Sequence, residues 1–299
     1  MSKCWKKQAL KLVLSSFLIT AIAPALLTNQ SHAQAQTTGI DPDLLAKASA
    51  GDKTAQSDVG LAYSMGKGVP KDYALAAAWY RKAADQGDSW AQYNLGALYD
   101  NGHGVPQSYT QAAIWYRKAA DQGESGAQLS LGSLYEFGDG VTQNYAQAAA
   151  WYSRAAAQGF APAQYSLGRL YEFGHGVTEN DAQAAMWYQK AAEQGEALAQ
   201  TNLGALYDTG KGVPLDYGRA AEWYLKAANQ GNSRAEYLLA TLYEQGKGIP
   251  QDYVRAVAWY RKGAEQGDPT AQFALGSHYF SGHGVPKNGS WRESGKSVV

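Results

Sequence analysis

The sequence predicts an all-α protein built from one helix-turn-helix unit that is copied along the chain. Six tryptophans stand 36 residues apart, each followed by a tyrosine: Trp79, Trp115, Trp151, Trp187, Trp223 and Trp259. A strict period of this length is typical of repeat proteins, in which each copy is one supersecondary unit. A residue required in every copy is most simply explained by packing that all copies share. The recurring positions are therefore predicted to be scaffold, and functional residues are expected where the copies differ.

The first half of each copy has the apolar period of a helix. In 87–99, Ala91, Leu95 and Tyr99 recur at i, i+4 and i+8, which places them on one helix face. Gly102 follows and opens a Gly-x-Gly pattern. Glycine adopts the left-handed conformation past a helix end without a side-chain clash. Each copy is thus predicted to start with a helix that ends in a glycine turn.

The second half of each copy begins at a column of capping residues. These are Asp72, Ser108, Asn144, Asn180, Asp216, Asp252 and Asn288. Their side chains cap the free backbone N–H groups at a helix start. Alanines at the helical period follow, which lets neighbouring helices approach closely, and the Trp–Tyr pair is predicted to fill the remaining volume.

The recurring residues resemble a known repeat family. Three patterns recur: Leu95-Gly96-x-x-Tyr99, Gly102-x-Gly104-Val105 and Ala112-x-x-Trp115-Tyr116-x-Lys118-Ala119-Ala120. They are similar to the Sel-one-like repeat, a 36-residue relative of the tetratricopeptide repeat. The resemblance covers 51–286, as six full copies (51–86, 87–122, 123–158, 159–194, 195–230 and 231–266) and half of a seventh. It implies a right-handed α/α solenoid that binds other proteins, usually as an adaptor in bacterial envelopes or as a secreted factor.

The first 33 residues read as an export signal. Lysines precede an apolar stretch over 12–27, and Ser31 and Ala33 form a small-x-small cleavage site. The apolar stretch contains Pro24 and falls short of the roughly 20 apolar residues that span a bilayer. We therefore expect cleavage after Ala33, no stable membrane insertion afterwards and a periplasmic or secreted protein; an uncleaved anchor is the alternative. Cys4, the only cysteine, lies before the apolar stretch, so the mature chain has neither disulfides nor a thiol nucleophile.

The two ends of the repeat array depart from the period. The segment 34–50 is predicted to be a linker followed by an N-terminal capping helix. In the C-terminal tail, 287–299, glycines stand where the repeat expects tyrosine and tryptophan. The first helix of the seventh copy then lacks a second helix to pack against. Phe273, Leu275 and Tyr279 on that helix are therefore expected to be partly exposed. Three interpretations remain: a disordered tail, cover by Trp291, or oligomerisation through the C-terminal end.

No residue pattern predicts catalysis, a cofactor or a metal. His103, His175 and His283 share the middle of the glycine turn but never in adjacent copies, too far apart for one zinc ion. His278 replaces a leucine of the repeat and is interpreted as part of a half-exposed end copy. Without the first 33 residues the chain has 22 basic and 26 acidic side chains, which argues against a nucleic-acid binder.

A basic ladder follows the tryptophans at three residues' distance. It comprises Lys82, Lys118, Arg154, Lys190, Lys226 and Lys262. Carboxylates such as Asp85 and Asp121 stand three residues further on. This is the spacing of ion pairs on a solvated helix face, so the ladder is predicted to be structural.

Candidate partner-binding residues come from the variable columns of the first helices, taken to line an inner groove as in tetratricopeptide arrays. They are Trp90, Tyr93, Asp100, Glu136, Phe137, Tyr165, Arg169, Glu172 and Phe173. The aromatic members have no evident share in the repeat core, and exposed apolar clusters commonly mark interaction surfaces. The acidic members belong to a column with Asp208 and Glu244. Two interpretations stay open for that column: selection of basic residues in a ligand, or a structural contact to the basic ladder or the glycine turn.

The sequence as a whole favours an exported, non-enzymatic adaptor that binds a protein or an extended peptide, with basic residues, along its groove. A binder of glycan or peptidoglycan is the alternative, since exposed aromatic side chains suit sugars as well. Some relatives of the repeat have been proposed to hydrolyse β-lactams, but no Ser-x-x-Lys pattern supports such an enzyme here.

Overall fold

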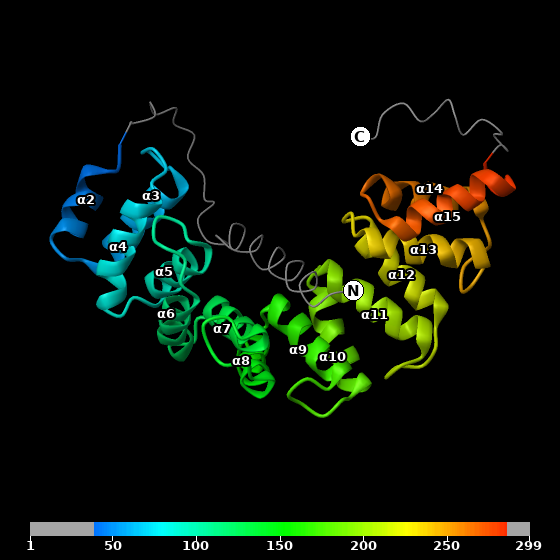
Figure 1. Ribbon diagram of the computed structural model, residues 1–299, viewed down its shortest axis with the longest axis horizontal. Helices are drawn as coiled ribbons and strands as arrows, with labels where there is room; N and C mark the ends of the chain where they lie inside the picture. Colours follow the sequence, from blue (N-terminus) through cyan, green and yellow to red (C-terminus); the bar gives the residue numbers. More distant parts are fainter. Residues whose placement is uncertain (1–38, 286–299) are drawn as a thin grey trace. The chain divides into compact units, whose positions relative to one another are not determined.

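The computed structural model describes residues 39–285, and every regular element in this range is an α-helix (Figure 1). The first helices of the copies are α3 (Lys53–Met65), α5 (Ser89–Asn101), α7 (Ser125–Phe137), α9 (Ala161–Phe173), α11 (Ala197–Thr209), α13 (Ser233–Gln245) and α15 (Pro269–Ser281). The second helices are α4 (Tyr73–Asp85), α6 (Tyr109–Asp121), α8 (Tyr145–Ala157), α10 (Asp181–Glu193), α12 (Tyr217–Ala228) and α14 (Tyr253–Glu265). Helix α2 (Pro42–Ser49) precedes them and packs on α3. The predicted all-α solenoid of two-helix repeats is confirmed.

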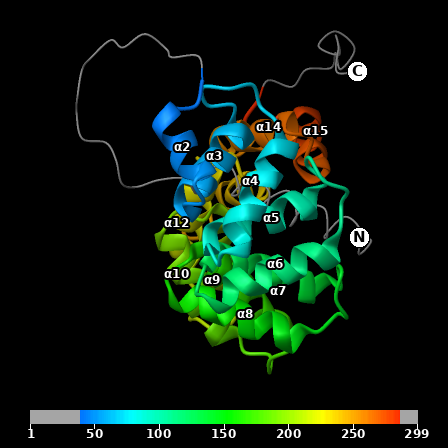
Figure 2. The same cartoon turned by 90° about the vertical axis from the view of Figure 1, so that its left-hand side faces the viewer.

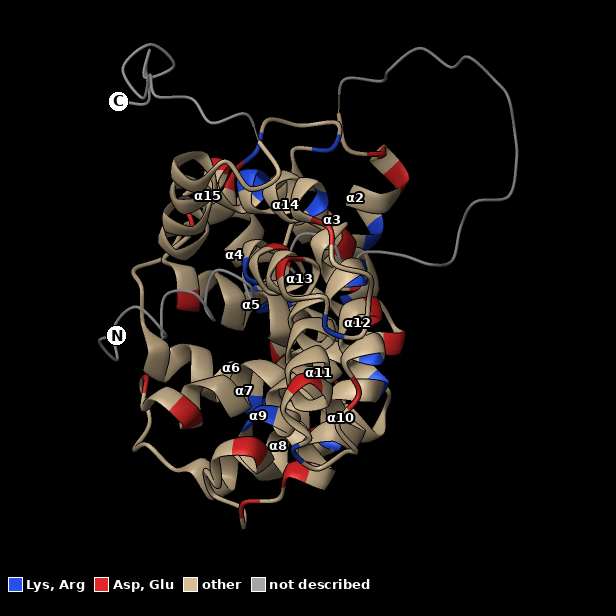
Figure 3. Cartoon of the chain, turned by 90° about the vertical axis from the view of Figure 1, so that its right-hand side faces the viewer, with Lys and Arg blue, Asp and Glu red and all other residues tan. Residues whose placement is uncertain are grey.

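Contacts divide the chain after Gln158 into two compact units. The first unit, described over 39–158, contains α2–α8 (Figure 2). The second, described over 159–285, contains α9–α15 (Figure 3). The export signal and the C-terminal tail from 287 lie outside the described residues. Within 39–285 no helix combines the length and the apolar character that crossing a membrane requires.

The second helices begin where the capping column predicts. Asp72 accepts 2.9 Å hydrogen bonds from the backbone N–H groups of Ala74 and Leu75. The side chains of Ser108, Asn144, Asn180, Asp216 and Asp252 each accept one such bond from the residue three positions later. The column's last member, Asn288, lies outside the described residues. The predicted caps are confirmed within that range.

Glycine ends each first helix, as predicted. Gly102 takes the left-handed conformation after α5, with φ of 70°. The second glycine of the turn has a separate reason. A Cβ on Gly104 would lie 2.2 Å from the carbonyl carbon of Tyr73, so only glycine lets the turn touch the start of the preceding second helix.

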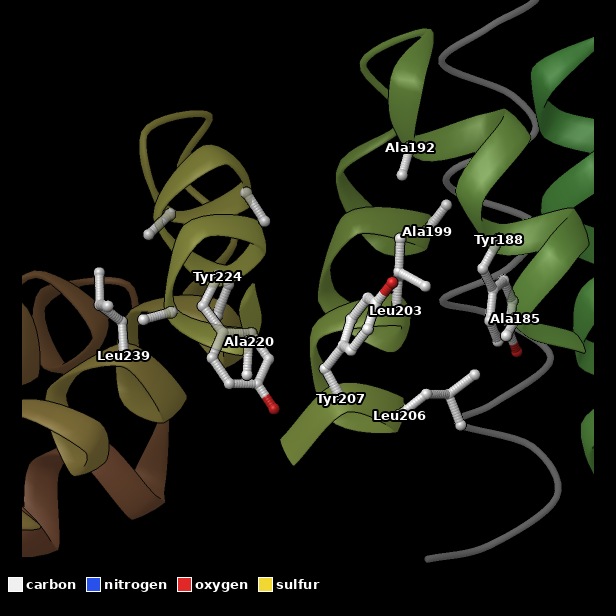
Figure 4. Close-up of a cluster of buried hydrophobic side chains, with 14 of the residues drawn as sticks. Ala185, Tyr188, Ala192, Ala199, Leu203, Leu206, Tyr207, Ala220, Tyr224 and Leu239 are labelled. Atoms are coloured by element: carbon white, nitrogen blue, oxygen red, sulfur yellow. The ribbon is translucent and has the colours of Figure 1, made fainter. Parts of the chain in front are cut away.

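The core centres on the tyrosine of each Trp–Tyr pair. These tyrosines, Tyr80, Tyr116, Tyr152, Tyr188, Tyr224 and Tyr260, are at most 2% exposed. Each lies across the first helix of its own copy, where a small residue makes room: a Cβ on Gly96 would stand 2.7 Å from Cδ1 of Tyr116. Figure 4 shows the second unit's core, with Tyr188 and Tyr224 among leucines and alanines.

A buried glutamine joins consecutive copies. Gln92 donates from Nε2 to the carbonyl oxygen of Ala84 at 3.0 Å, and its Oε1 accepts from Gln122 at 2.7 Å. Buried amides need partners on both ends, and this geometry provides them. It explains why every copy keeps Ala-Gln or Ala-Glu at this position.

The basic ladder contacts tryptophan rings. The Nζ atom of Lys118 lies 4.0 Å from the ring centre of Trp115, and the same contact recurs at 3.9–4.5 Å in the other copies. Such cation–π contacts contribute about 0.5–1 kcal/mol at exposed sites. The ladder is structural, as predicted, but it contacts the ring three residues earlier rather than the carboxylate three residues later.

Candidate functional site

In the first unit, the predicted anchors Trp90 and Tyr93 lie on α5 and are half-buried. The ring of Trp90 meets that of Tyr80 edge-on at 5.8 Å. Tyr93 lies 5.8 Å from Tyr116, and a Cβ on Gly126 of α7 would come within 3.0 Å of its ring. The premise that these side chains have no share in the core is therefore wrong. Each packs on a core tyrosine and shows only part of its ring to solvent.

In the second unit, Tyr165 and Arg169 on α9 are also half-buried. The Tyr165 ring lies 5.8 Å from Tyr188, and the guanidinium carbon of Arg169 lies 6.0 Å from the Tyr165 ring centre. Burial raises the pKa of the Tyr165 phenol, as it does the pKa of Tyr93. Both phenols are therefore neutral at physiological pH and offer a partner no negative charge.

The acidic column accepts hydrogen bonds from the core tyrosines. Asp100 accepts from the Tyr116 hydroxyl at 3.2 Å, Glu136 from Tyr152 at 2.8 Å, and Glu172 from Tyr188. The interpretation of the acidic column as structural is right, but the predicted contact is wrong. Each carboxylate contacts the tyrosine phenol of its own copy rather than the basic ladder or the glycine turn. Glu136 is only 3% exposed, which does not fit selection of a partner's basic residues.

The two predicted phenylalanines end their first helices and are less enclosed. Phe137, the last residue of α7, is half-buried. Phe173, the last residue of α9, is 53% exposed, and its ring centre lies 6.0 Å from that of His175. Of the nine candidates, Phe173 offers the most apolar surface to a partner.

The histidines serve as packing groups. His103 and His283 stack on Tyr73 and Tyr253 at 4.8 and 5.1 Å. The sequence analysis did not predict this packing role. The recurrence of histidine or lysine in the middle of the glycine turn was the pattern that could have indicated it. His278 belongs to an end copy that is partly exposed, as predicted, since Phe273 is 80% exposed and Leu275 and Tyr279 are half-buried, but the histidine itself is enclosed. It is 3% exposed, and its Nδ1 donates to the carbonyl oxygen of His283 at 2.9 Å. Over residues 39–285 no group of three or more His, Cys, Asp or Glu is placed to hold a metal ion.

Tandem two-helix copies with recurring glycine turns and a tyrosine-centred core define a helical repeat protein. The Sel1 repeat model matches the chain at residues 53–88, 91–124, 125–160, 161–196, 197–232, 233–268 and 269–290. The chain belongs to the Sel1 repeat family, whose members commonly mediate protein–protein interactions.

Two solved structures support this assignment. A protective antigen of uropathogenic Escherichia coli strains, with an SLR fold, is 42% identical over 83% of this chain, with a TM-score of 0.78. This chain spans 53% of that antigen, about half its length. A Sel1 repeat protein from Oxalobacter formigenes is 36% identical over 75% of this chain and 88% of its own, with a TM-score of 0.67. No curated protein matches the chain.

Proposed function

We propose that this protein is an exported, non-enzymatic adaptor that binds a partner polypeptide through exposed side chains of its first helices. Family membership supports protein binding in general, and the sequence of the first 33 residues supports export. The observation that carries the proposal is Phe173, which is 53% exposed at the end of α9, whereas the other aromatic candidates are half-buried. An aromatic side chain held on a rigid helix is the kind of anchor that dominates interface energy.

The chemistry around Phe173 suggests what the partner presents. Glu172, next to Phe173 in the chain, is half-buried and accepts the Tyr188 hydrogen bond through Oε2. We propose that its other oxygen, Oε1, accepts from a basic group of the partner. The half-buried Tyr165 ring lies on the same helix, two turns before Phe173. An extended peptide that places an apolar side chain on Phe173 and a lysine or arginine at Glu172 fits both features.

The test is capture of envelope polypeptides by the full chain, followed by a binding measurement with a captured polypeptide. Phe173→Ala should weaken binding at least tenfold, because it removes the exposed anchor. Phe280→Ala is the matched control: it also removes an exposed phenylalanine, 79% exposed on α15, and should leave binding unchanged. Equal affinity of both variants and the unaltered chain would overturn the assignment of the anchor.

Two other outcomes would replace the proposal. Retention on cell-wall polymer, without polypeptide capture, would favour the glycan-binding alternative. Turnover of a chromogenic β-lactam would favour an enzyme. Export is tested separately by fractionation and by the N-terminal mass: a chain that begins at Gln34 in the envelope fits the proposal, and an intact chain confined to the cytoplasm contradicts it.

A further inference from the structure

The end of the array presents an aromatic face on α15, which we call the end face: Phe273, Ser277 and Phe280. Phe273 and Phe280 are 80% and 79% exposed, the two most exposed large hydrophobic residues within 39–285. Ser277 is also exposed. The spacing i, i+4 and i+7 places the three on one side of the helix.

In the preceding copy, the two positions equivalent to these phenylalanines both contact the core tyrosine of the second helix. Tyr237, which is equivalent to Phe273, lies 5.7 Å from the Tyr260 ring. Glu244, which is equivalent to Phe280, accepts a 2.6 Å hydrogen bond from the Tyr260 hydroxyl. The period places the next such tyrosine at position 296, where the sequence has lysine. The end face is thus the surface that a second-helix tyrosine would cover, and the sequence supplies none there.

The residue at position 280 shows which chemistry suits this surface. The column holds a carboxylate in five successive copies, Asp100, Glu136, Glu172, Asp208 and Glu244, before it changes to phenylalanine. A carboxylate would accept a hydrogen bond from a phenol, whereas Phe280 accepts none. The surface has changed from one that pairs with a tyrosine hydroxyl to one that pairs with an apolar group.

The charge distribution favours a second copy of the chain as the occupant. Helix α15 carries no Asp, Glu, Lys or Arg over its whole length (Figure 3). A charged peptide finds no complementary group on it, and a second α15 meets no like charge. Phe273 and Phe280 are seven residues apart, about 10 Å along the axis. In an antiparallel pair around a two-fold axis, Phe273 of each copy would therefore lie beside Phe280 of the other, with both Ser277 side chains near the axis.

We propose that two copies of this protein associate through the end face, α15 against α15, in a symmetric dimer. The contact involves one helix from each copy, so the dimer forms at high protein concentration and dissociates on dilution. This inference does not rest on the proposed function, because the end face and Phe173 lie on different helices.

Sedimentation of the full chain over a range of concentrations tests the proposal. The average mass should rise with concentration towards twice the monomer mass. Phe280→Glu restores the acid of the preceding copies and should keep the mass at that of a monomer at every concentration. Phe173→Glu is the matched control, since it puts the same charge on another exposed phenylalanine and should associate like the unaltered chain. A monomeric unaltered chain, or a Phe280→Glu chain that still dimerises, would overturn the proposal.

Disulfide cross-linking locates the contact and excludes association through other segments. In a Cys4→Ser background, Ser277→Cys should give a covalent dimer on mild oxidation. Ser153→Cys, at an exposed position of α8, should not. Failure of Ser277→Cys to cross-link, as expected if residues after 285 or another polypeptide cover the end face, would count against the dimer. Loss of polypeptide capture in Phe173→Ala with intact dimerisation would keep the two proposals separate.

Discussion

The hydroxyl of Tyr152 donates a 2.8 Å hydrogen bond to the carboxylate of Glu136, sixteen residues earlier in the same copy. The pairs Tyr116–Asp100, Tyr224–Asp208 and Tyr260–Glu244 repeat the arrangement at 3.2, 3.4 and 2.6 Å. In the first copy Ser64 takes the place of the acid, 3.2 Å from the Tyr80 hydroxyl. A buried phenol needs a hydrogen-bond partner. The acidic column of the first helices satisfies that need, which explains why it recurs so regularly.

We expect Tyr152→Phe to lower the free energy of unfolding by about 1–3 kcal/mol, because it takes a donor from a buried carboxylate. Urea unfolding measures the loss. Tyr145→Phe is the control, since that hydroxyl lies in an exposed contact with Gln143 and its removal should cost less than about 0.5 kcal/mol. Equal losses in the two variants would mean that the Glu136 contact adds no stability.

Alkaline pH should destabilise the fold through its core tyrosines. Burial raises the pKa of Tyr80 to about 12, against an ordinary value of about 10. The unfolded chain therefore loses this proton at lower pH than the folded chain. The stabilisation is complete below about pH 10 and is lost as pH rises towards 12, by up to about 2.7 kcal/mol for this residue. Tyr80→Phe should flatten the fall in stability measured between pH 9 and 12; an unchanged slope would contradict the assignment.

The sequence predicted the local structure well, because caps and turns depend on neighbours in the chain. Asp72 caps the helix that follows it directly, and Gly102 ends the helix that precedes it. The candidate site was harder to predict. The repeat period shows which residues are equivalent, but not which columns face each other across the two helices of one copy. Tyr93 packs on Tyr116 and Glu136 accepts a hydrogen bond from Tyr152, each the core tyrosine of its own copy. The packing of the two helices against each other determines these contacts.

Phe173 and Phe280 also show what the repeat period can and cannot predict. Both positions are exposed. Phe173 was predicted from its variable column, whereas Phe280 was not among the end residues predicted to be exposed. For Phe280 the signal was in the sequence, as a carboxylate column that changes to phenylalanine in the last copy. Its meaning required knowledge of the carboxylate's partner, Tyr260, which only the three-dimensional arrangement gives.

Glycine in the middle of a first helix should not tolerate even a methyl group. A Cβ on Gly204 would lie 2.6 Å from Cε1 of Tyr224, so Gly204→Ala should cost about 1–3 kcal/mol through overpacking. Gly218 of α12 is the control, because its nearest neighbour is the Asp216 side chain at 3.3 Å rather than a core ring at 2.6 Å. Gly218→Ala should leave stability unchanged or raise it by up to about 1 kcal/mol. Thermal melts measure both variants. A loss of stability of similar size in Gly204→Ala and Gly218→Ala would contradict the packing argument.

Trp151→Ala should cost about 3–5 kcal/mol, the usual range for truncating a large buried aromatic residue. The ring is 4% exposed and lies under two guanidinium groups, those of Arg117 at 5.4 Å and Arg154 at 4.4 Å. Because contacts in a solenoid are local, hydrogen exchange should speed up in α6–α8 more than in α2 and α3. Uniform loss of protection across the first unit would contradict a linear array.

Each tryptophan ring has one position of the preceding copy beside it, and the residue at that position varies along the chain. Trp223 is more exposed to solvent than Trp115. In the first unit, Arg81 lies 4.8 Å from the Trp115 ring and donates to the Tyr99 hydroxyl at 2.6 Å. For Trp223 the position equivalent to Arg81 is Gln189, which donates instead to Glu193 at 2.8 Å. Trp115 is 3% exposed, whereas Trp223 is only partly buried.

Gln189→Arg should therefore stabilise the second unit by about 0.5–1 kcal/mol, the contribution of a cation–π contact near the surface. Gln189→Met is the matched control, with similar length and no charge, and should give less than half of that gain. The gain of the arginine variant should persist at high salt, because contact with the ring face rather than long-range charge attraction provides it. Urea unfolding at low and high salt measures both effects; an arginine variant no more stable than the methionine variant would show that exposure of Trp223 has a cause other than the missing guanidinium.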